Sequence, residues 1–193
     1  MKLIALPASP FVSKCRMAAR HLGLELETAP ADVVGQGEDL MGVNPLGKIP
    51  ALVDGDDAVF DSRVIVAWLN RKGGGDLYPD DPRMEAERME ALADGIADAA
   101  VAVTQEKRYH AAENVERSWI DRQWNKVERG LVHAAERLPP AEDGIHAGSL
   151  ALAATLHYLD LRFEGEWRNE ALRGWLQRFD AAHPDLAALK PAA

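Results

Sequence analysis

The sequence predicts two domains, a small α/β domain near residues 1–75 and an all-helical domain near residues 83–193. Two observations predict this fold class. Short strand-like runs mix with helical patterns in the first part, whereas the second part shows apolar residues at helical spacing only. Between them, the segment KGGGDLYPDDP holds three glycines and two prolines, so we expect a linker at 76–82.

The first domain is expected to contain four strands and two helices. KLIAL and the alternating LELETA are typical of strands, and PALVD and AVFD predict two more, split by a turn at 54–57. Apolar residues at helical spacing predict a helix over 13–22 and another in DSRVIVAWLNR. The chain order is therefore strand–helix–strand, then strand–strand–helix.

The second domain is expected to contain four helices. Apolar residues recur at helical spacing from 89 to 103 and from 120 to 138, and the last helix carries Leu172, Trp175, Leu176 and Phe179. SLALAATLHYLDL is apolar almost all round, which indicates a helix buried on most sides. A ligand site between two domains is a usual arrangement.

Composition argues against several classes of partner. The formal net charge is −9, and neutralising phosphates requires Lys and Arg, so we expect neither nucleic acid nor anionic membranes as partners. The first apolar run ends at Pro7, too early for an export signal, and no stretch is long enough for a membrane helix, so a cytoplasmic protein is expected. Cys15 is the only cysteine and no histidine pair has metal-ligand spacing, so we expect no disulfide and no metal.

The segment GVNPLGKIP fits most of a phosphate-binding loop, G-x-x-x-x-G-K. The pattern needs Ser or Thr next to hold magnesium, but Ile49 stands there. Pro50 follows, and the residue before a proline avoids helical angles, so the segment leads into a strand instead of a helix. A nucleotide site is therefore not expected.

The second polar motif, FDSRVIVAWL, places Asp61 and Ser62 at a helix start. Asp and Ser are common capping residues, and capping alone explains them. The alternative is a binding role, in which Ser62 binds a ligand carboxylate at the positive helix end and Asp61 accepts from a ligand ammonium.

Three motifs occur in fixed order, SPFVSKCR, NPLGKIPAL and FDSRVIVAWL, before helices that contain EALADGIADAAVA and LALAATLHYLDLR. Together they resemble the cytosolic glutathione transferase family, in particular bacterial members with a serine at the first turn, over essentially the whole chain. The resemblance implies a thioredoxin-like first domain, an all-helical second domain, a homodimer, a role in detoxification and glutathione as co-substrate.

The resemblance also implies site residues. Ser9 would be the catalytic residue, whose hydroxyl stabilises the glutathione thiolate without becoming a covalent nucleophile, and Phe11 would line the site. Pro50 matches the family's cis-proline, so Ile49 would pair with the cysteinyl backbone of glutathione. Lys48 would reach the glycyl carboxylate.

Asp61 and Ser62 match the family's grip on the γ-glutamyl group. Tyr109, His110 and Trp119 are candidates for the electrophile pocket. Trp124 and His157 are expected in the core, and Cys15 as a small buried hydrophobe.

The sequence departs from the family pattern at two places. Ser13 stands where close relatives commonly have a basic residue. The buried helix usually starts with a Ser/Thr-x-x-Asp capping box, but this chain has His146, Ala147, Gly148 and Ser149. We expect Ser149 to cap that helix alone.

Three functions remain open at this point. The leading one is a glutathione transferase that activates the thiol for attack on a small hydrophobic electrophile. The alternatives are glutathione-dependent isomerisation or peroxide reduction, and a non-catalytic binding module of the same fold.

Overall fold

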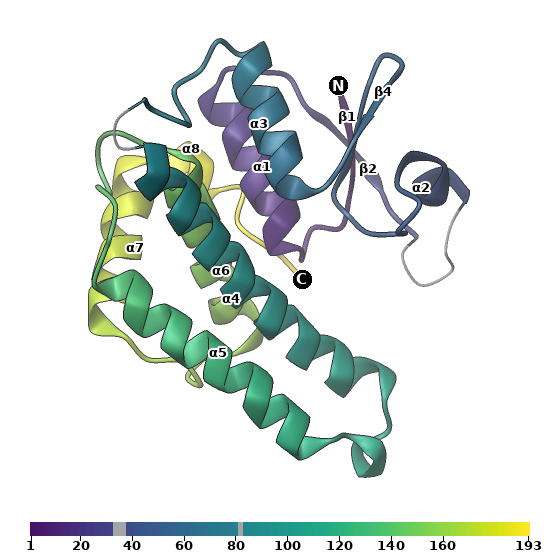
Figure 1. Ribbon diagram of the computed structural model, residues 1–193, viewed down its shortest axis with the longest axis vertical. Coiled ribbons are helices and arrows are strands. Elements are labelled where there is room, and N and C mark those ends of the chain that lie inside the picture. The colour runs from purple at the N-terminus through teal and green to yellow at the C-terminus, as the bar shows by residue number, and fades with distance from the viewer. Residues whose placement is uncertain (33–37, 81–82) are drawn as a thin grey trace.

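The computed structural model describes residues 1–32, 38–80 and 83–193, with a small sheet at one side and a group of helices at the other (Figure 1). The sheet has four strands in the order β2-β1-β3-β4. These are β1 (Lys2–Ala5), β2 (Glu27–Pro30), β3 (Ala51–Asp54) and β4 (Asp57–Val59). β1 is parallel to β2 and antiparallel to β3, which pairs with β4 in a hairpin.

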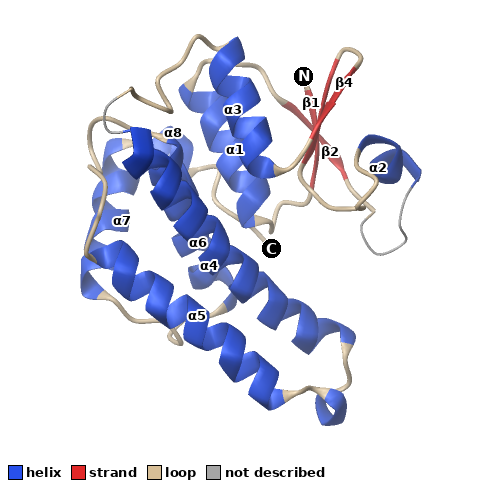
Figure 2. Ribbon diagram, viewed as in Figure 1, coloured by secondary structure: helices blue, strands red, loops and turns tan. Residues whose placement is uncertain are grey.

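Helices cover both faces of this sheet (Figure 2). α1 (Pro10–His21) and α3 (Ser62–Lys72) pack on one face, and the short α2 (Glu38–Val43) lies on the other. The strand residues divide accordingly, since successive side chains point to opposite faces. Leu3, Ala5 and Leu52 join the main core with α1, while Ile4 and Ala51 form a smaller cluster with Leu40 of α2.

The helical part consists of α4 (Arg83–Tyr109), a 3-10 turn η1 (Ala112–Asn114), α5 (Arg117–Ala135), α6 (Ala147–Arg162), α7 (Glu170–Ala182) and α8 (Pro184–Ala187). α6 is central and packs against both α4 and α1, so it joins the two parts of the molecule. Its residues from 147 to 159 are all buried, which confirms the reading of its apolar sequence. Among the described residues, no helix is long and apolar enough to cross a membrane.

Several predicted boundaries were wrong. The first helix starts at Pro10 instead of residue 13, because Ser9 caps it and a proline is well tolerated in the first turn. β2 starts at Glu27, so Leu24 to Leu26 are not in the strand that LELETA predicted. Pairing begins with Lys2 opposite Glu27, and the Glu27 amide donates to the Met1 carbonyl at 3.1 Å. The sequence analysis also missed α2, η1 and α8.

The predicted linker at 76–82 is described only as far as Asp80, and residues 81–82, with the expected solvated Asp81, lie outside the described ranges. Asp80 is exposed, but Leu77 is fully buried. The Leu77 amide donates to Asn70 Oδ1 at 2.9 Å, and its carbonyl accepts from the Ala147 amide at 2.9 Å. Leu77 therefore ties this segment to both α3 and α6.

Candidate active site

Ser9 is the N-cap of α1 and lies in the segment that connects β1 to this helix. Its Oγ accepts a hydrogen bond from the Val12 amide at 3.3 Å, and its backbone is extended. Within the described part of the chain, the Ser9 hydroxyl donates to no other residue. Its proton is therefore available to an acceptor outside the protein, beside the positive end of a three-turn helix. Phe11 is half-buried in the first turn of the same helix.

The loop that precedes β3 is held by Asn44, which is 2% exposed. Its side-chain amide donates to the Lys48 carbonyl at 2.7 Å, and its Oδ1 accepts from the Leu46 amide at 3.0 Å. The peptide bond between Ile49 and Pro50 is cis, as the resemblance implied. This loop runs directly into β3, so the expectation that the segment leads into a strand instead of a helix is confirmed.

Asp61 and Ser62 stand at the start of α3. Asp61 is the N-cap, and its Oδ1 accepts from the Arg63 amide at 3.0 Å, which confirms the capping interpretation. Ser62 is 5% exposed. The peptide bond between Phe60 and Asp61 is also cis, a feature that the sequence analysis did not anticipate.

A buried ionic network joins both of these helix starts to α4. The Lys14 Nζ, on α1, lies 2.8 Å from Asp94 Oδ2 and 3.1 Å from Glu90 Oε1, and all three side chains are about 5% exposed or less. The Arg63 Nε donates to the same Asp94 oxygen at 2.9 Å, and the Tyr78 hydroxyl donates to Glu90 at 2.9 Å. A single carboxylate, Asp94, therefore links the helix of Ser9 to the helix of Ser62.

The pKa values in this network follow from burial and from the close opposite charges. Burial alone would lower the pKa of Lys14, but the carboxylates of Asp94 and Glu90 outweigh it and raise the pKa above its ordinary value. Burial raises the pKa of Glu90, against the effect of Lys14. Lys14 is therefore held firmly in its charged form.

Asp98, one turn beyond Asp94 on α4, belongs to the same electrostatic environment. Burial raises the pKa of the Asp98 carboxyl, the nearby Asp94 carboxylate raises it further, and Arg63 and Lys48 oppose this. The Asp61 carboxylate also raises the pKa of Asp98. The pKa of Asp98, on the helical part, therefore responds to charged groups of the sheet part of the molecule.

Neither Ser13 nor Cys15 faces the space beside Ser9. The Ser13 hydroxyl donates to the Leu189 carbonyl at 2.8 Å, so this serine ties α1 to the segment after α8. Cys15 is fully buried, with its Sγ 3.7 Å from the Ser62 carbonyl, and burial raises the pKa of its thiol. The expectation that Cys15 is a small buried hydrophobe is confirmed.

The expectation that Ser149 caps α6 alone was wrong. His146 is the N-cap, and its Nδ1 accepts from the Ser149 amide at 3.2 Å. In turn, the Ser149 hydroxyl oxygen accepts a hydrogen bond from the His146 amide at 3.5 Å. A neutral imidazole nitrogen thus replaces the usual hydroxyl or carboxylate oxygen as the cap acceptor. Burial lowers the pKa of His146, which favours that neutral form.

The three candidate electrophile-pocket residues lie near the far end of the α4–α5 pair. Tyr109 is 56% exposed and Trp119 is 37% exposed, and the His110 Nδ1 lies 3.0 Å from Glu106. Tyr109 is 15 residues beyond Asp94 in α4, about 22 Å at 1.5 Å per residue. Their role in an electrophile pocket stays a prediction.

Of the two residues expected in the core, His157 is buried, whereas Trp124 is half-buried and packs against the core. Trp124 packs on Phe163 with ring centroids 4.9 Å apart. His157 is 6% exposed, and its Nε2 lies 3.0 Å from Asp180. Each side chain has a structural explanation.

Sequence reasoning missed Asn44, Lys14, Asp94 and Asp98. The only local signal was the spacing of Glu90, Asp94 and Asp98, which places three acids in one row along α4. Such a row usually faces solvent, and nothing local revealed that a lysine 80 residues earlier meets it.

Comparison with known proteins identifies the family. The family model for the N-terminal domain of glutathione S-transferase matches residues 3–76. The uncharacterised GST-like protein YibF of Escherichia coli K12 is 30% identical over 169 residues, which cover 84% of this chain and 83% of YibF. The chain belongs to the glutathione S-transferase family.

Two solved glutathione transferase structures share the whole fold. One from Methylobacterium radiotolerans, in complex with glutathione sulfonate, is 32% identical with a TM-score of 0.88, covering 100% of this chain and 95% of its own. One from Pseudomonas fluorescens Pf-5, with bound glutathione, is 33% identical with a TM-score of 0.89, covering 100% and 99%. The thioredoxin-like sheet domain followed by a helical domain is therefore confirmed as the fold of this family member.

Proposed function

We propose that this family member is a cytoplasmic glutathione transferase in which Ser9 stabilises the thiolate of bound glutathione. The observation that carries the proposal is the Ser9 hydroxyl. It accepts from the Val12 amide and keeps its own proton for another acceptor. A thiol with a pKa near 8.5 is mostly protonated at neutral pH, so a donor aimed at sulfur raises the reactive fraction.

The residues present can supply the electrostatic stabilisation that a bound thiolate needs. Lowering the thiol pKa by about 2 units stabilises the thiolate by about 2.7 kcal/mol. A hydroxyl donor and a helix N-terminus each contribute about 1–2 kcal/mol to an adjacent anion. The ionised sulfur then attacks an electrophile, forming a carbon–sulfur bond as the leaving group departs with its electron pair.

The remaining site residues would hold glutathione in extended form. Ile49 would pair its backbone with the cysteinyl residue, as a strand added to a sheet edge does. Asp61 and Ser62 would grip the γ-glutamyl head group, and Lys48 would reach the glycyl carboxylate. Support comes from the cis bond before Pro50 and from relatives that bind glutathione.

Kinetics with a chloronitrobenzene tests the proposal. Purified protein should conjugate it to glutathione, and Ser9→Ala should lower the rate roughly tenfold or more. Because alanine also removes the helix cap, Ser9→Gly is the matched variant, since glycine at an N-cap costs only a few tenths of a kcal/mol. Ser9→Thr keeps the hydroxyl and should keep most of the rate. Wild-type rates in both Ser9→Ala and Ser9→Gly would remove Ser9 from the mechanism.

Glutathione calorimetry separates this enzyme from a non-catalytic binding module of the same fold. Binding heat at millimolar glutathione is expected, and its absence would favour the binding module.

We also propose a homodimer, because Val64 on α3 and Met84 on α4 are apolar and respectively 47% and 62% exposed. Light scattering should then give about twice the chain mass of 21.1 kDa.

A further inference from the structure

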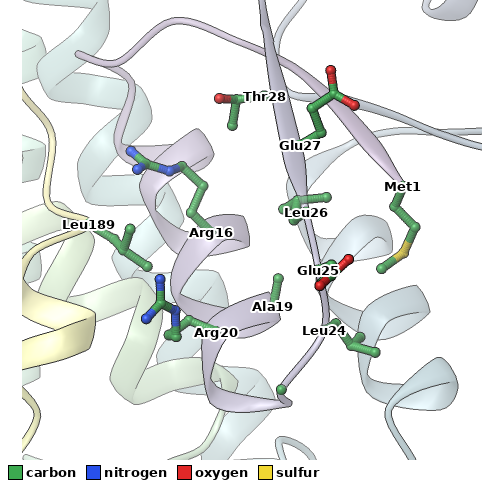
Figure 3. Close-up of a pocket in the computed structure, with 11 residues that line it drawn as sticks. Met1, Arg16, Ala19, Arg20, Leu24, Glu25, Leu26, Glu27, Thr28 and Leu189 are labelled. Atoms are coloured by element: carbon green, nitrogen blue, oxygen red, sulfur yellow. The ribbon is translucent and has the colours of Figure 1, made fainter.

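A separate pocket lies at the C-terminal end of α1, away from Ser9 (Figure 3). Its volume is about 680 Å³, and four parts of the chain form it: Met1, the second half of α1, residues 23–28, and Leu189 after α8. Arg16 and Arg20 are 7 and 11 residues beyond Ser9, about 10 and 16 Å along the helix, and none of the residues proposed to bind glutathione lines the pocket. The pocket is therefore not part of the proposed glutathione site.

Two arginines of α1 line this pocket, Arg16 and Arg20, one helical turn apart. Their positions in the sequence bring their Cβ atoms to about 5–6 Å from each other. Across residues 1–32, 38–80 and 83–193, neither guanidinium has a hydrogen bond or an ion pair, although the chain carries a net charge of −9. Partial burial lowers the pKa of Arg16, and the charge of Arg20 adds to this effect. The pair is thus a concentration of positive charge without a counter-ion from the described residues.

The two glutamates that also border the pocket do not neutralise this pair. β2 pairs Thr28 with Leu3, which faces α1, and Glu27 with Lys2, whose side chain points to the other face. In Figure 3, both arginine side chains extend from α1 towards Leu189, whereas the carboxylates of Glu25 and Glu27 point away from them. The arginines and the two carboxylates therefore extend in different directions.

The rest of the lining is suited to an apolar group. Leu24, Leu26 and Leu189 are each half-buried, and all three pack against the main core. The hydrogen bond from Ser13 to the Leu189 carbonyl fixes one wall of the pocket to α1. Thr28, which pairs with Leu3, adds a hydroxyl on the face of the sheet that α1 covers. Figure 3 shows Leu189 on the side to which the guanidinium groups extend, and Leu24 and Leu26 on the strand side of α1. This lining matches a molecule with an anionic head and an apolar body.

We propose that this pocket binds a small organic anion, with a phosphate, sulfonate or carboxylate group between Arg16 and Arg20 and an apolar ring or chain against the leucines. Guanidinium groups suit such oxyanions because they offer several donors in a fixed plane. The site is independent of the proposed chemistry at Ser9, and both can be occupied at once.

Calorimetry of the full chain, saturated with glutathione, tests this with phenyl phosphate as the probe. Phenyl phosphate should bind, inorganic phosphate and phenol should each bind at least tenfold more weakly, and benzoate reports whether a carboxylate serves as well. Arg16→Gln and Arg20→Gln should each weaken phenyl phosphate binding at least fivefold. Arg108→Gln and Arg122→Gln, exposed arginines elsewhere, are the matched controls and should leave it unchanged.

Two results would overturn the proposal. One is unchanged phenyl phosphate binding in the doubly substituted protein R16Q/R20Q, or no binding to the wild-type protein at millimolar concentration. The other is competition between phenyl phosphate and glutathione, which would assign the probe to the site near Ser9. Circular dichroism checks that each variant is folded. Thr28→Val is a second, milder change, on the strand side of the pocket.

Discussion

The Nζ of Lys14 lies 2.8 Å from Oδ2 of Asp94, so a buried ion pair joins the helix of Ser9 to the helical part of the molecule. Arg63 shares the same carboxylate and belongs to the helix that begins at Ser62. The spacing of the two helix N-termini therefore depends on α4.

We expect Lys14→Met to destabilise the protein by about 3–5 kcal/mol, because it leaves Glu90 and Asp94 buried without their main counter-charge. Urea unfolding measures this. Arg88→Ala is the control, since it breaks a pair with Glu85 in which both side chains are about half exposed, and it should cost under about 1 kcal/mol. Similar midpoints for the two variants would show that the buried network contributes little.

The capping box of α6 predicts a pH dependence. The pKa of His146 is lowered, so its contribution to stability is present above its ordinary value of 6.5 and is lost as pH falls below 6.5 through the lowered value. His146→Asn keeps an acceptor for the Ser149 amide without titrating there. The difference in unfolding free energy between the two proteins should therefore change below pH 6.5, and a constant difference would argue against His146 as a titrating cap.

Close approach of α4 and α6 predicts opposite effects for two glycine substitutions. A Cβ at Gly148 would lie 2.7 Å from the Ala86 carbonyl oxygen and 2.6 Å from the Met89 Cβ, so Gly148→Ala should destabilise by about 1–3 kcal/mol. A Cβ at Gly174, inside α7, meets only an Arg178 nitrogen at 3.6 Å, so Gly174→Ala should stabilise by about 0.5–1 kcal/mol. Thermal melts of the two variants should move in opposite directions.

Asp98 offers a test of how α4 contributes to glutathione binding. The pKa of its carboxyl responds to the charges of both Lys48 and Asp61, which are proposed to bind opposite ends of glutathione. We expect Asp98→Asn to weaken glutathione binding about threefold to tenfold, because an ammonium group loses a nearby negative charge. Glu87→Gln, an exposed acid on the same helix, is the control. Equal affinities of the two variants in calorimetry would show that Asp98 lies outside the site.

The sequence predicted the parts of this fold that local patterns determine. The strands around Leu3 and Leu52 follow from short apolar runs, and the helix after Asp61 follows from a capping residue and apolar residues at helical spacing. α2 was missed because it is only six residues long and contains Gly42. The ionic network was missed because Lys14 and Asp94 are 80 residues apart, and each alone is typical of a solvent-exposed helix face. His146 was missed as a cap because neutral histidine rarely serves as an N-cap acceptor.

The most direct test of the central claim is the pKa of the glutathione thiol when it is bound to this protein. Ultraviolet difference absorption of the thiolate, followed against pH, measures it in wild-type protein and in Ser9→Gly. The account predicts a wild-type value about 2 units below that of free glutathione, and a value in Ser9→Gly that returns at least halfway towards the free one. Equal thiol pKa values in the two proteins, or a wild-type value no lower than in solution, would contradict it.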